Sequence, residues 1–451
     1  MEEEETKMNF KKIFVLAKEK GIEDLELYIS QNKKLSISIF HKKVESYNVA
    51  ENEVLSARGI YHGKMGCAYT ERLDSEMAEF IVDSIIKNAQ IIEENKEVSL
   101  FAGSPKYKKM KTYNDSFAKV AVKDKIARLL KAEQVALDYD PRIVEVAGLS
   151  YEEEENKISI INSQGLNLSQ KTVDAMCYCE TLAKEKEDSK TGFKYQIISN
   201  FEEFNPEKVA IDSAKEAISQ LLAEPVRSKK YKILLDATVM ASMISSLKRS
   251  LFGENINKNK SKLIDKLNQK IASSKVTLIE EPHSKKYPFY YRSFDDEGVA
   301  TSTKKIIDKG VLKTYLYNLE SAQEAKVETT GNGYKNGPLG VVATNTALLI
   351  LKPGKKSKEE IMQKMKNGLY ITGIQGIHAG MDGLSGNFSL QANGYMIEDG
   401  VIVKPVNLIT IAGNLFTLFE TITEVANDST ITYNGVECPS VFVKSLVVSG
   451  K

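Results

Sequence analysis

Phe294-Asp295-Asp296-Glu297-Gly298-Val299-Ala300-Thr301 places three adjacent carboxylates and one glycine between apolar segments. An acidic cluster beside a glycine is typical of a solvated turn. A structural interpretation is that the carboxylates accept backbone hydrogen bonds while Gly298 adopts a conformation barred to other residues. A functional interpretation is that Asp295, Asp296, Glu297 and Gly298 shape a cleft that contacts a peptide or a partner loop. We favour the structural interpretation and keep the cleft as the alternative.

Two small-residue motifs follow the acidic stretch, at Thr329-Thr330-Gly331-Asn332 and Ala412-Gly413-Asn414. Small residues let two backbones approach closely, and an asparagine side chain can bond its own turn. We therefore predict structural turns at Gly331, Asn332, Gly413 and Asn414. A phosphate-binding loop is a poor alternative, because no Lys-Ser/Thr pair follows these glycines.

A third segment runs from Met381 to Met396 and leads from a glycine-rich loop into an alternating strand. Within it, Asn387, Phe388 and Ser389 stand where a plain β-hairpin would begin.

The composition is that of a soluble globular protein, with 42% hydrophobic and 27% charged residues. A chain of 451 residues is expected to form two to three domains. The 62 basic and 61 acidic residues nearly cancel, so there is no net basic field to collect phosphates. Nucleic acid is therefore not an expected partner, although a local basic patch stays open.

Several features predict a cytoplasmic protein. No run approaches the roughly 18 apolar residues that cross a bilayer. The acidic start Met1-Glu-Glu-Glu-Glu lacks the apolar core of a signal peptide. The four cysteines show no disulfide framework, so reduced thiols are expected.

Glycine usage divides the chain near residue 225. Residues 1–225 hold 8 of the 27 glycines and residues 226–451 hold the other 19. The first part reads as two similar helix-plus-antiparallel-sheet units, at about 1–100 and 101–225. The second part, 226–451, reads as a mainly β domain with a few helices. The predicted fold class is therefore α+β.

Periodicity predicts the individual elements. Apolar spacing and capping residues predict helices at residues 10–20, from a cap at Asp74 or Ser75 to about 88, and at 122–137, 206–222, 237–252 and 357–367. Alternation predicts strands at residues 35–40, 53–61, 67–70, 143–151, 157–161, 168–179, 192–199 and 232–236. Two similar strings, at 306–312 and 396–402, each predict a hairpin with an acidic turn.

The four histidines do not form a zinc helix, because none lies within five residues of another. His41 and His62 are expected on separate strands and could share a metal only if those strands meet. Surface or hydrogen-bonding roles are the better interpretation for both, as for His283 and His378.

Cys177-Tyr178-Cys179 places two thiols on one face of a strand, where they could bind one metal. A lone Cys-x-Cys without a second pair is more typical of buried apolar thiols.

From residue 294 onward, the ordered motifs resemble the C-terminal half of the TldD/PmbA family, and the match extends over about residues 35–450. Catalytic members of that family carry a His-Glu-x-x-x-His zinc helix after a strand like residues 232–236. Here the helix reads Val239-Met-Ala-Ser-Met-Ile-Ser-Ser-Leu-Lys-Arg-Ser-Leu-Phe252, with no His and no Glu. The family's third ligand, a cysteine in a Cys-Gly context, is also missing, because Cys438 lies in Glu437-Cys-Pro-Ser. Without a Lewis acid and a base, no activated water is expected.

With these ligands missing, the chain resembles the PmbA branch of the family, also called TldE, which keeps the fold without the metal motif. The step from Gly253 to Ser261 matches the characteristic run of that branch, and residues 275–283 resemble its strand before the acidic motif. The resemblance also carries the older family label of a modulator of DNA gyrase. It implies that Asn387, Phe388 and Ser389 line a cleft, with the start of a plain β-hairpin as the alternative.

The resemblance implies a non-catalytic subunit of a metallopeptidase complex that acts on unfolded peptides or small proteins. A TldD-like homologue would form a dimer with this chain and supply the zinc. The chain itself is expected to hold no catalytic residue, no metal ligand and no cofactor, and to be inactive alone. The first alternative is a stand-alone homodimeric peptide-binding or scaffold protein. A second alternative is a hydrolase with a relocated site at Asp295, Asp296, Glu297 and His283.

Overall fold

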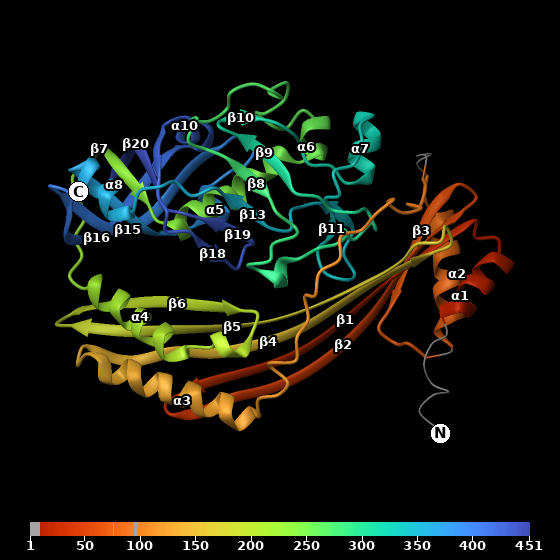
Figure 1. The fold of residues 1–451 in the computed structure, drawn as a ribbon, viewed down its shortest axis with the longest axis horizontal. Helices are drawn as coiled ribbons and strands as arrows, with labels where there is room; N and C mark the ends of the chain where they lie inside the picture. The colour runs from red at the N-terminus through yellow and green to blue at the C-terminus, as the bar shows by residue number, and fades with distance from the viewer. Residues whose placement is uncertain (1–9, 75, 94–97) are drawn as a thin grey trace.

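The computed structural model describes residues 10–74, 76–93 and 98–451. Its fold is α+β, with helices on an antiparallel sheet followed by a mainly β half (Figure 1). The first sheet has the strand order β3-β2-β1-β4-β5-β6. Its strands are β1 (Asp24–Phe40), β2 (Lys43–Tyr61), β3 (Lys64–Thr70), β4 (Ile143–Asn162), β5 (Asn167–Glu185) and β6 (Asp188–Ile198).

The strands of this sheet are longer than predicted. Separate strands were expected at residues 143–151 and 157–161, but β4 runs through both, and β1 extends back from the expected residues 35–40 to Asp24. The polar middle of the sheet stays extended because its side chains pair across strands. Lys33 lies 2.7 Å from Glu51, and Lys34 lies 2.9 Å from Glu152. Charged residues can therefore continue a strand when the neighbouring strand supplies the opposite charge.

Two pairs of helices cover opposite ends of this sheet (Figure 1). At one end α1 (Phe10–Glu19) and α2 (Met77–Gln90) pack on the first three strands, and at the other end α3 (Val122–Tyr139) and α4 (Pro206–Ser219) pack on β4 to β6. The four helices predicted for this part of the chain are confirmed. The cap of α2 differs, because its first turn follows Glu76, while Asp74 accepts a hydrogen bond from the Glu76 amide. Ser75 lies outside the described residues.

Two glycines allow the helices to approach the sheet closely. A Cβ on Gly66 of β3 would stand 1.9 Å from the Ile85 carbonyl oxygen of α2. A Cβ on Gly192 of β6 would stand 2.1 Å from the Ser213 carbonyl oxygen of α4. Both contacts are possible only without a side chain, so each helix lies directly on the backbone of a strand.

The second half contains two six-stranded sheets with α5 (Ala237–Leu247) between them. One sheet has the order β16-β15-β14-β7-β20-β17 and the other the order β10-β9-β8-β13-β19-β18. The first comprises β7 (Lys229–Leu235), β14 (Gly368–Gln375), β15 (Asn387–Glu398), β16 (Val401–Asn414), β17 (Ile422–Val425) and β20 (Val441–Ser449). The second comprises β8 (Leu278–Glu280), β9 (Lys304–Asp308), β10 (Val311–Leu312), β13 (Leu349–Leu351), β18 (Thr430–Thr432) and β19 (Val436–Cys438).

Shorter elements complete this half. The remaining helices are α6 (Gly253–Asn257), α7 (Leu319–Ala325), α8 (Lys358–Met365), α9 (Ile377–Gly380) and α10 (Leu415–Glu420), and a two-stranded ribbon joins β11 (Gly333–Lys335) to β12 (Val342–Thr344). The predicted hairpins are confirmed as β9–β10 and β15–β16. The predicted helix at residues 357–367 is confirmed as α8, with Ser357 and Glu360 forming its capping box. The helix predicted at 237–252 ends earlier, since α5 passes into a 3₁₀ turn at Lys248.

The two halves meet through hydrogen bonds at the acidic stretch. The Tyr107 hydroxyl donates to the carbonyl oxygen of Gly298 at 2.8 Å. The Gln170 side chain donates to the Tyr291 carbonyl at 2.6 Å and accepts from the Ser293 amide at 2.6 Å. Residues 291–298 are thus held against the first sheet.

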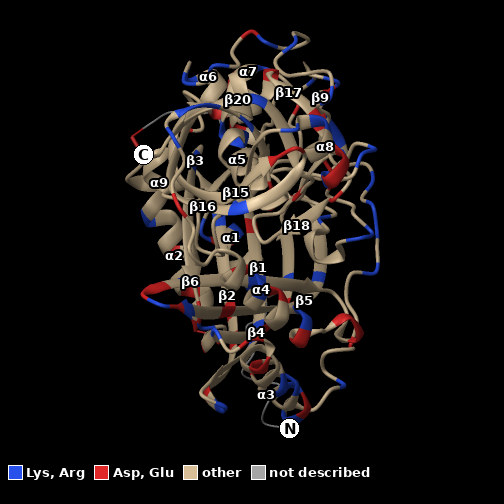
Figure 2. Cartoon of the chain, turned by 90° about the vertical axis from the view of Figure 1, so that its left-hand side faces the viewer, with Lys and Arg blue, Asp and Glu red and all other residues tan. Residues whose placement is uncertain are grey.

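Charge is mixed over the whole molecule. Figure 2 shows basic and acidic residues interspersed along the helices and strands, in agreement with the near-zero net charge. Within the described residues, no helix has both the length and the apolar composition needed to cross a bilayer.

Candidate functional site

The acidic stretch is buried between the two halves and is not a solvated turn. Asp295 is 0% exposed, Asp296 3% and Glu297 4%. Buried carboxylates are stable only when donors surround them, so the hydrogen bonds of each one describe its role.

Asp295 holds the turn together. Its Oδ1 accepts the backbone N–H groups of Glu297 at 3.0 Å and Val299 at 2.9 Å, and its Oδ2 accepts that of Gly333 at 2.8 Å. Burial, together with the nearby Glu297 charge, still raises the pKa of Asp295 well above its usual value, against the effect of these three donors. The side chain therefore joins its own turn to β11.

Asp296 connects three separate segments. Its Oδ2 accepts the backbone N–H of Lys335 at 2.8 Å. Its Oδ1 accepts the Tyr28 hydroxyl from β1 at 3.2 Å and lies 3.4 Å from the Arg292 guanidinium. Asp296 therefore fixes the end of β11 above the first sheet.

Glu297 and Gly298 complete the turn. Glu297 Oε2 accepts the N–H of Leu319 at 2.8 Å, at the first residue of α7, where a helix dipole favours negative charge. Burial raises the pKa of Glu297. Gly298 has φ of +84°, and a Cβ there would stand 2.5 Å from the Leu166 side chain. A glycine is therefore required by both backbone conformation and space.

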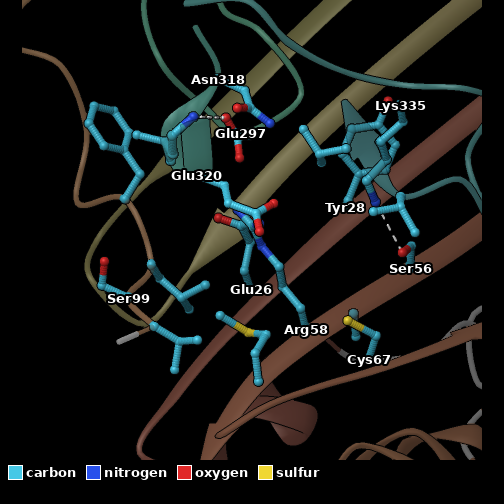
Figure 3. A pocket seen from close by; sticks show the side chains of 18 of the residues that line it. Glu26, Tyr28, Ser56, Arg58, Cys67, Ser99, Glu297, Asn318, Glu320 and Lys335 are labelled. Atoms are coloured by element: carbon cyan, nitrogen blue, oxygen red, sulfur yellow. Dashed lines mark hydrogen bonds and ion pairs between the residues drawn. The ribbon is translucent and has the colours of Figure 1, made fainter. Parts of the chain in front are cut away.

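Beside Glu297 lies a cavity of about 1390 Å³, which we call the interdomain cavity. It is bounded by β1 to β3, α2, residues 98–103, Glu297, α7 with its cap Asn318, and the segment from Lys335 to Val342 (Figure 3). Of the acidic stretch, only Glu297 lines it. A concave site between two halves of a chain is a common location of a ligand.

One face of the first sheet forms the floor of the interdomain cavity. Two rows of side chains run across the strands on this face. The strand register aligns Glu26, Arg58 and Cys67 in one row, and Tyr28, Ser56 and Tyr69 in the other. The opposite face carries Leu27, Leu55 and Ala57 in the core under α1 and α2. Strand alternation thus places polar side chains in the cavity and apolar ones in the core.

Two cations stand on this floor. Arg58 Nε donates to Glu26 Oε1 at 2.8 Å, while Arg58 Nη2 is buried and has no hydrogen-bond partner among the described residues. Lys335 Nζ donates to Ser56 Oγ at 3.1 Å and lies 4.1 Å from the centre of the Tyr28 ring. Burial and the nearby Arg58 charge lower the pKa of Lys335 to about 8.

Much of the remaining lining of the interdomain cavity is apolar. The apolar side chains come from β3, α2, residues 98–103, α7 and β12. They include Met65, Phe80, Leu100, Leu319 and Val342. Hydroxyl and amide groups lie among them, at Ser84, Asn88, Ser99 and Thr329.

Helix α5 occupies the position of the expected zinc helix and does not reach the interdomain cavity. Met240, Met243 and Ile244 are completely buried between the two sheets of the second half. Asp236 caps the helix by accepting the Thr238 amide at 3.0 Å. Thioether and aliphatic side chains in an apolar core do not fit a zinc ion, which needs about three imidazole, thiolate or carboxylate ligands.

The histidines lie apart from one another. His41 and His62 lie in the turns at the two ends of β2, so their expected placement on separate strands is wrong. A strand of 19 residues separates them by roughly 60 Å, which excludes a shared metal. The His283 side chain hydrogen-bonds Thr301 Oγ1 at 3.1 Å and does not bond Asp295, Asp296 or Glu297. His378 lies on α9.

The paired cysteines behave as apolar side chains. Cys177 and Cys179 are buried on β5, as predicted, and burial raises the pKa of each thiol, that of Cys179 to about 12. Cys438 is also buried, whereas Cys67 is exposed. In the described part of the chain, no group of three or more His, Cys, Asp or Glu side chains is arranged to hold a metal ion.

The second group of predicted cleft residues lies elsewhere. Asn387, Phe388 and Ser389 begin β15 and do not line the interdomain cavity. Phe388 is buried in the core, next to Gly413 on β16. Asn414 donates to Asn387 Oδ1 at 2.9 Å and caps α10 by accepting the Phe416 amide at 3.0 Å. A contact of these residues with peptide stays a prediction.

The motif at Gly331 and Asn332 bonds both its own turn, where Asn332 Oδ1 accepts the Thr330 hydroxyl at 2.7 Å, and a distant strand. Gly331 has φ of +67°. The side chain of Asn332 is fully buried and donates to both Glu280 oxygens, at 2.9 and 3.0 Å, and to the Asn345 carbonyl at 2.7 Å. This asparagine therefore connects β8 to the β11–β12 ribbon.

Local sequence patterns did not identify Glu26, Arg58 or Lys335 as site residues. A signal was present in residues 54–58, Val-Leu-Ser-Ala-Arg, where Ser56 and Arg58 share one face of an otherwise apolar run. No local signal places Lys335 beside them, since 277 residues separate Lys335 from Arg58.

Comparisons with known proteins agree with the fold. Models of the PmbA/TldA metallopeptidase match the chain in three parts, domain 1 at residues 25–89, the central domain at 115–221 and the C-terminal domain at 228–450. A metalloprotease PmbA homolog of Buchnera aphidicola subsp. Baizongia pistaciae is 30% identical over 348 residues, which cover 76% of this chain and 74% of that protein.

Solved structures are similar over almost the whole length. A candidate modulator of a DNA gyrase from Thermotoga maritima has a TM-score of 0.89 and 31% identity, and covers 97% of this chain and 99% of its own. TldE from Thermococcus kodakarensis has a TM-score of 0.90 at 22% identity, with coverage of 98% and 99%, which shows a shared fold. This chain is therefore a member of the PmbA/TldD family of peptidase-related proteins.

Proposed function

We propose that this chain is a non-catalytic subunit of a PmbA/TldD-type metallopeptidase complex, in which it binds unfolded peptide while a homologue supplies the zinc and the hydrolysis. The observation that carries the proposal is the composition of the buried face of α5. At the position where the family's zinc helix is expected, its buried face is made of methionine and aliphatic side chains in a closed core.

Hydrolysis by a metallopeptidase requires a metal to polarise the carbonyl and a base to activate water. Between Val239 and Phe252 this chain has neither histidine nor carboxylate. The chain nevertheless keeps the fold of the family, which supports a role in binding and assembly.

The interdomain cavity supports the binding part of the proposal. Its volume of about 1390 Å³ exceeds that of most small-molecule sites, which is roughly 300–1,000 Å³. Apolar side chains with interspersed hydroxyl and amide groups suit a peptide, whose backbone needs hydrogen bonds and whose side chains need apolar contacts. The four free cysteines are consistent with work in the reducing cytoplasm, where we place the complex.

The test mixes this chain with a family member that carries an intact His-Glu-x-x-x-His motif. Hydrolysis of an unfolded protein is measured for the homologue alone, for this chain alone and for mixtures of increasing ratio. We expect the rate to rise until the ratio reaches one to one, and a complex of both chains to appear by light scattering. A mixture no faster than the homologue alone would overturn the subunit role.

A second candidate function is a stand-alone homodimeric peptide-binding or scaffold protein, favoured by a free strand edge. In the described structure, β3 pairs only with residues 55–61 of β2, so residues 43–54 have no strand on their outer side. On this edge Val44 is 40%, Tyr47 48% and Val49 63% exposed. Two copies could pair antiparallel here, because a register that places Tyr47 opposite its own copy sets Lys43 opposite Glu51.

Light scattering of the isolated chain separates the two candidates. A dimer at micromolar concentration that becomes a monomer in Tyr47→Lys, but not in the control Val15→Lys on the exposed face of α1, would favour self-pairing. A clean monomer of the unmodified chain would exclude it.

A further inference from the structure

We propose that the interdomain cavity recognises the carboxyl-terminal end of an apolar peptide, with the terminal carboxylate bound between Arg58 and Lys335. The inference rests on the proposed peptide-binding function and adds to it a substrate class and a direction of binding. The chemistry is an apolar chain that ends in a carboxylate.

The two cations are arranged on one face of the sheet. Ser56 and Arg58 are two residues apart on β2 and share the cavity face. Because Lys335 Nζ bonds Ser56 Oγ at 3.1 Å, the ammonium group is held on the same face as the guanidinium (Figure 3). The space between these two groups is the proposed position of the ligand's carboxylate.

Both cations also have donors left over. Arg58 Nη2 has no partner among the described residues but is itself enclosed, so a ligand in the cavity reaches Arg58 through the 23% of its side chain that is exposed. Ser56 Oγ is the one side-chain acceptor that the described structure gives Lys335 Nζ. A buried donor without an acceptor destabilises the protein, and a carboxylate supplies two acceptor oxygens.

The nearby carboxylates already accept hydrogen bonds, one of them from Arg58 itself. Both oxygens of Glu26 accept hydrogen bonds, Oε1 from Arg58 Nε and Oε2 from the Asn162 side chain. Glu297 accepts the Leu319 amide, and Asp296 accepts the Lys335 amide. Arg58 Nε is thus engaged by Glu26, and the remaining donors of Arg58 and Lys335 are left for a ligand.

The apolar lining specifies which residues stand next to the carboxylate in the ligand. Leu100, Leu319 and Val342 can contact aliphatic or aromatic side chains of the last residues of a peptide. Ser99 lies among them and would stay unbonded against an alkyl chain, but can bond a peptide backbone. This polar group favours a peptide over a fatty acid, which shares the same end group.

Cys67 provides a direct readout of occupancy. It is the register partner of Arg58 on β3, it lines the cavity, and it is exposed while the other three cysteines are buried. A thiol reagent should therefore modify Cys67 first, and a bound peptide should slow that reaction. The measurement needs no catalytic activity.

The experiment compares four probes on the full chain. They are the pentapeptide Ala-Val-Leu-Ala-Phe as free acid, its N-acetylated form, its C-terminal amide, and laurate. We expect the free acid and the N-acetylated acid to protect Cys67 with similar affinity, at least tenfold tighter than the amide or laurate. Equal protection by acid and amide would overturn carboxylate recognition while leaving peptide binding intact. Protection by laurate alone would overturn the peptide assignment, and no protection by any probe would overturn the ligand site.

Variants of Lys335 separate charge recognition from structure. Lys335→Met should bring the affinities for acid and amide within about threefold of each other, whereas Lys335→Arg should keep the preference. Lys352→Met, an exposed lysine outside the cavity, is the matched control and should leave the preference unchanged. An unaltered preference in Lys335→Met would overturn the role of this cation. Failure of these binding tests does not depend on whether a mixture with the catalytic homologue hydrolyses protein, so the two proposals can fail separately.

Discussion

Asp295 Oδ2 accepts a hydrogen bond from the backbone N–H of Gly333 at 2.8 Å, across 38 residues of sequence. Nearby, the side chain of Glu297 occupies the space in which a Cβ of Gly333 would lie. Asp296 repeats the connection by accepting the amide of Lys335. The acidic stretch therefore positions β11 and, through it, the lysine that stands over the interdomain cavity.

Two substitutions of Asp295 should destabilise the protein to different degrees. Asp295→Ala leaves three buried N–H groups without an acceptor, and we expect a loss of about 3 kcal/mol or more in the free energy of unfolding. Asp295→Asn keeps the two bonds to Oδ1 and should lose about 1–2 kcal/mol. Urea unfolding measures both. Asp138→Ala on the exposed side of α3 is the control and should stay within about 0.5 kcal/mol; equal effects at both sites would contradict the structural role of Asp295.

Two glycines with positive φ distinguish backbone strain from packing. Gly63 has φ of +72° and open space where a Cβ would stand, whereas Gly298 has φ of +84° and would bring its Cβ to 2.5 Å from Leu166. Gly63→Ala should cost about 1 kcal/mol from the backbone alone. Gly298→Ala should lower the free energy of unfolding by about 1–3 kcal/mol more, because its Cβ crowds Leu166. Thermal or urea unfolding measures both variants. Similar losses for the two variants would show that Leu166 moves aside freely.

Asp174 should make stability depend on pH. Burial, and then the Glu154 charge opposite it on β4, raise the pKa of Asp174 to about 7, and Tyr290 faces it from the second half. Between pH 4 and 7 the folded protein holds a proton that the unfolded chain has lost, so this contribution to stability declines as the pH rises through that range. Asp174→Asn should remove the decline and be more stable than the unmodified chain at pH 8, by roughly 1–3 kcal/mol. Parallel pH curves for the two proteins would contradict the assignment; Asp138→Asn serves as control.

Peptide binding should weaken as the pH rises through about 8. Lys335 is cationic below its pKa of about 8, and the groups around it are Arg58, Asp296, Glu26 and Cys67. Loss of its proton removes half of the proposed carboxylate site, so the protection of Cys67 by the free-acid pentapeptide should fall between pH 7 and pH 9. In Lys335→Arg the guanidinium stays charged, and the affinity should change less than threefold over this range. A pH profile shared by both proteins would place the titration elsewhere.

The purified chain should contain no stoichiometric zinc and should cleave no unfolded peptide. The physical reason is the absence of imidazole and carboxylate groups on α5. Metal analysis and a peptide-hydrolysis assay, each with and without a chelator, measure this directly. About one tightly bound zinc per chain, lost together with activity on chelation, would contradict it.

Local patterns predicted most elements of the fold. The helices α1 to α4 and α8 follow from apolar spacing and caps, and the two acidic hairpins follow from their turn residues. The error at β4 has a physical origin, since the run Glu152-Glu153-Glu154-Glu155 looks like a break until Lys34 and Lys171 pair with it from neighbouring strands. Periodicity describes one segment, whereas charge compensation in a sheet depends on other segments, some of them more than 100 residues away.

The sequence by itself determined the family, the α+β class and the absence of a zinc helix, because these depend on residue types at short, fixed spacings. Only the tertiary structure decided what Asp295, Asp296 and Glu297 do, because three adjacent carboxylates have the same local pattern in water and in a core. Burial between two halves of the chain turned them into acceptors for Gly333, Lys335 and Leu319. The interdomain cavity likewise arises from β2 and β11, whose cations Arg58 and Lys335 meet only when the chain folds.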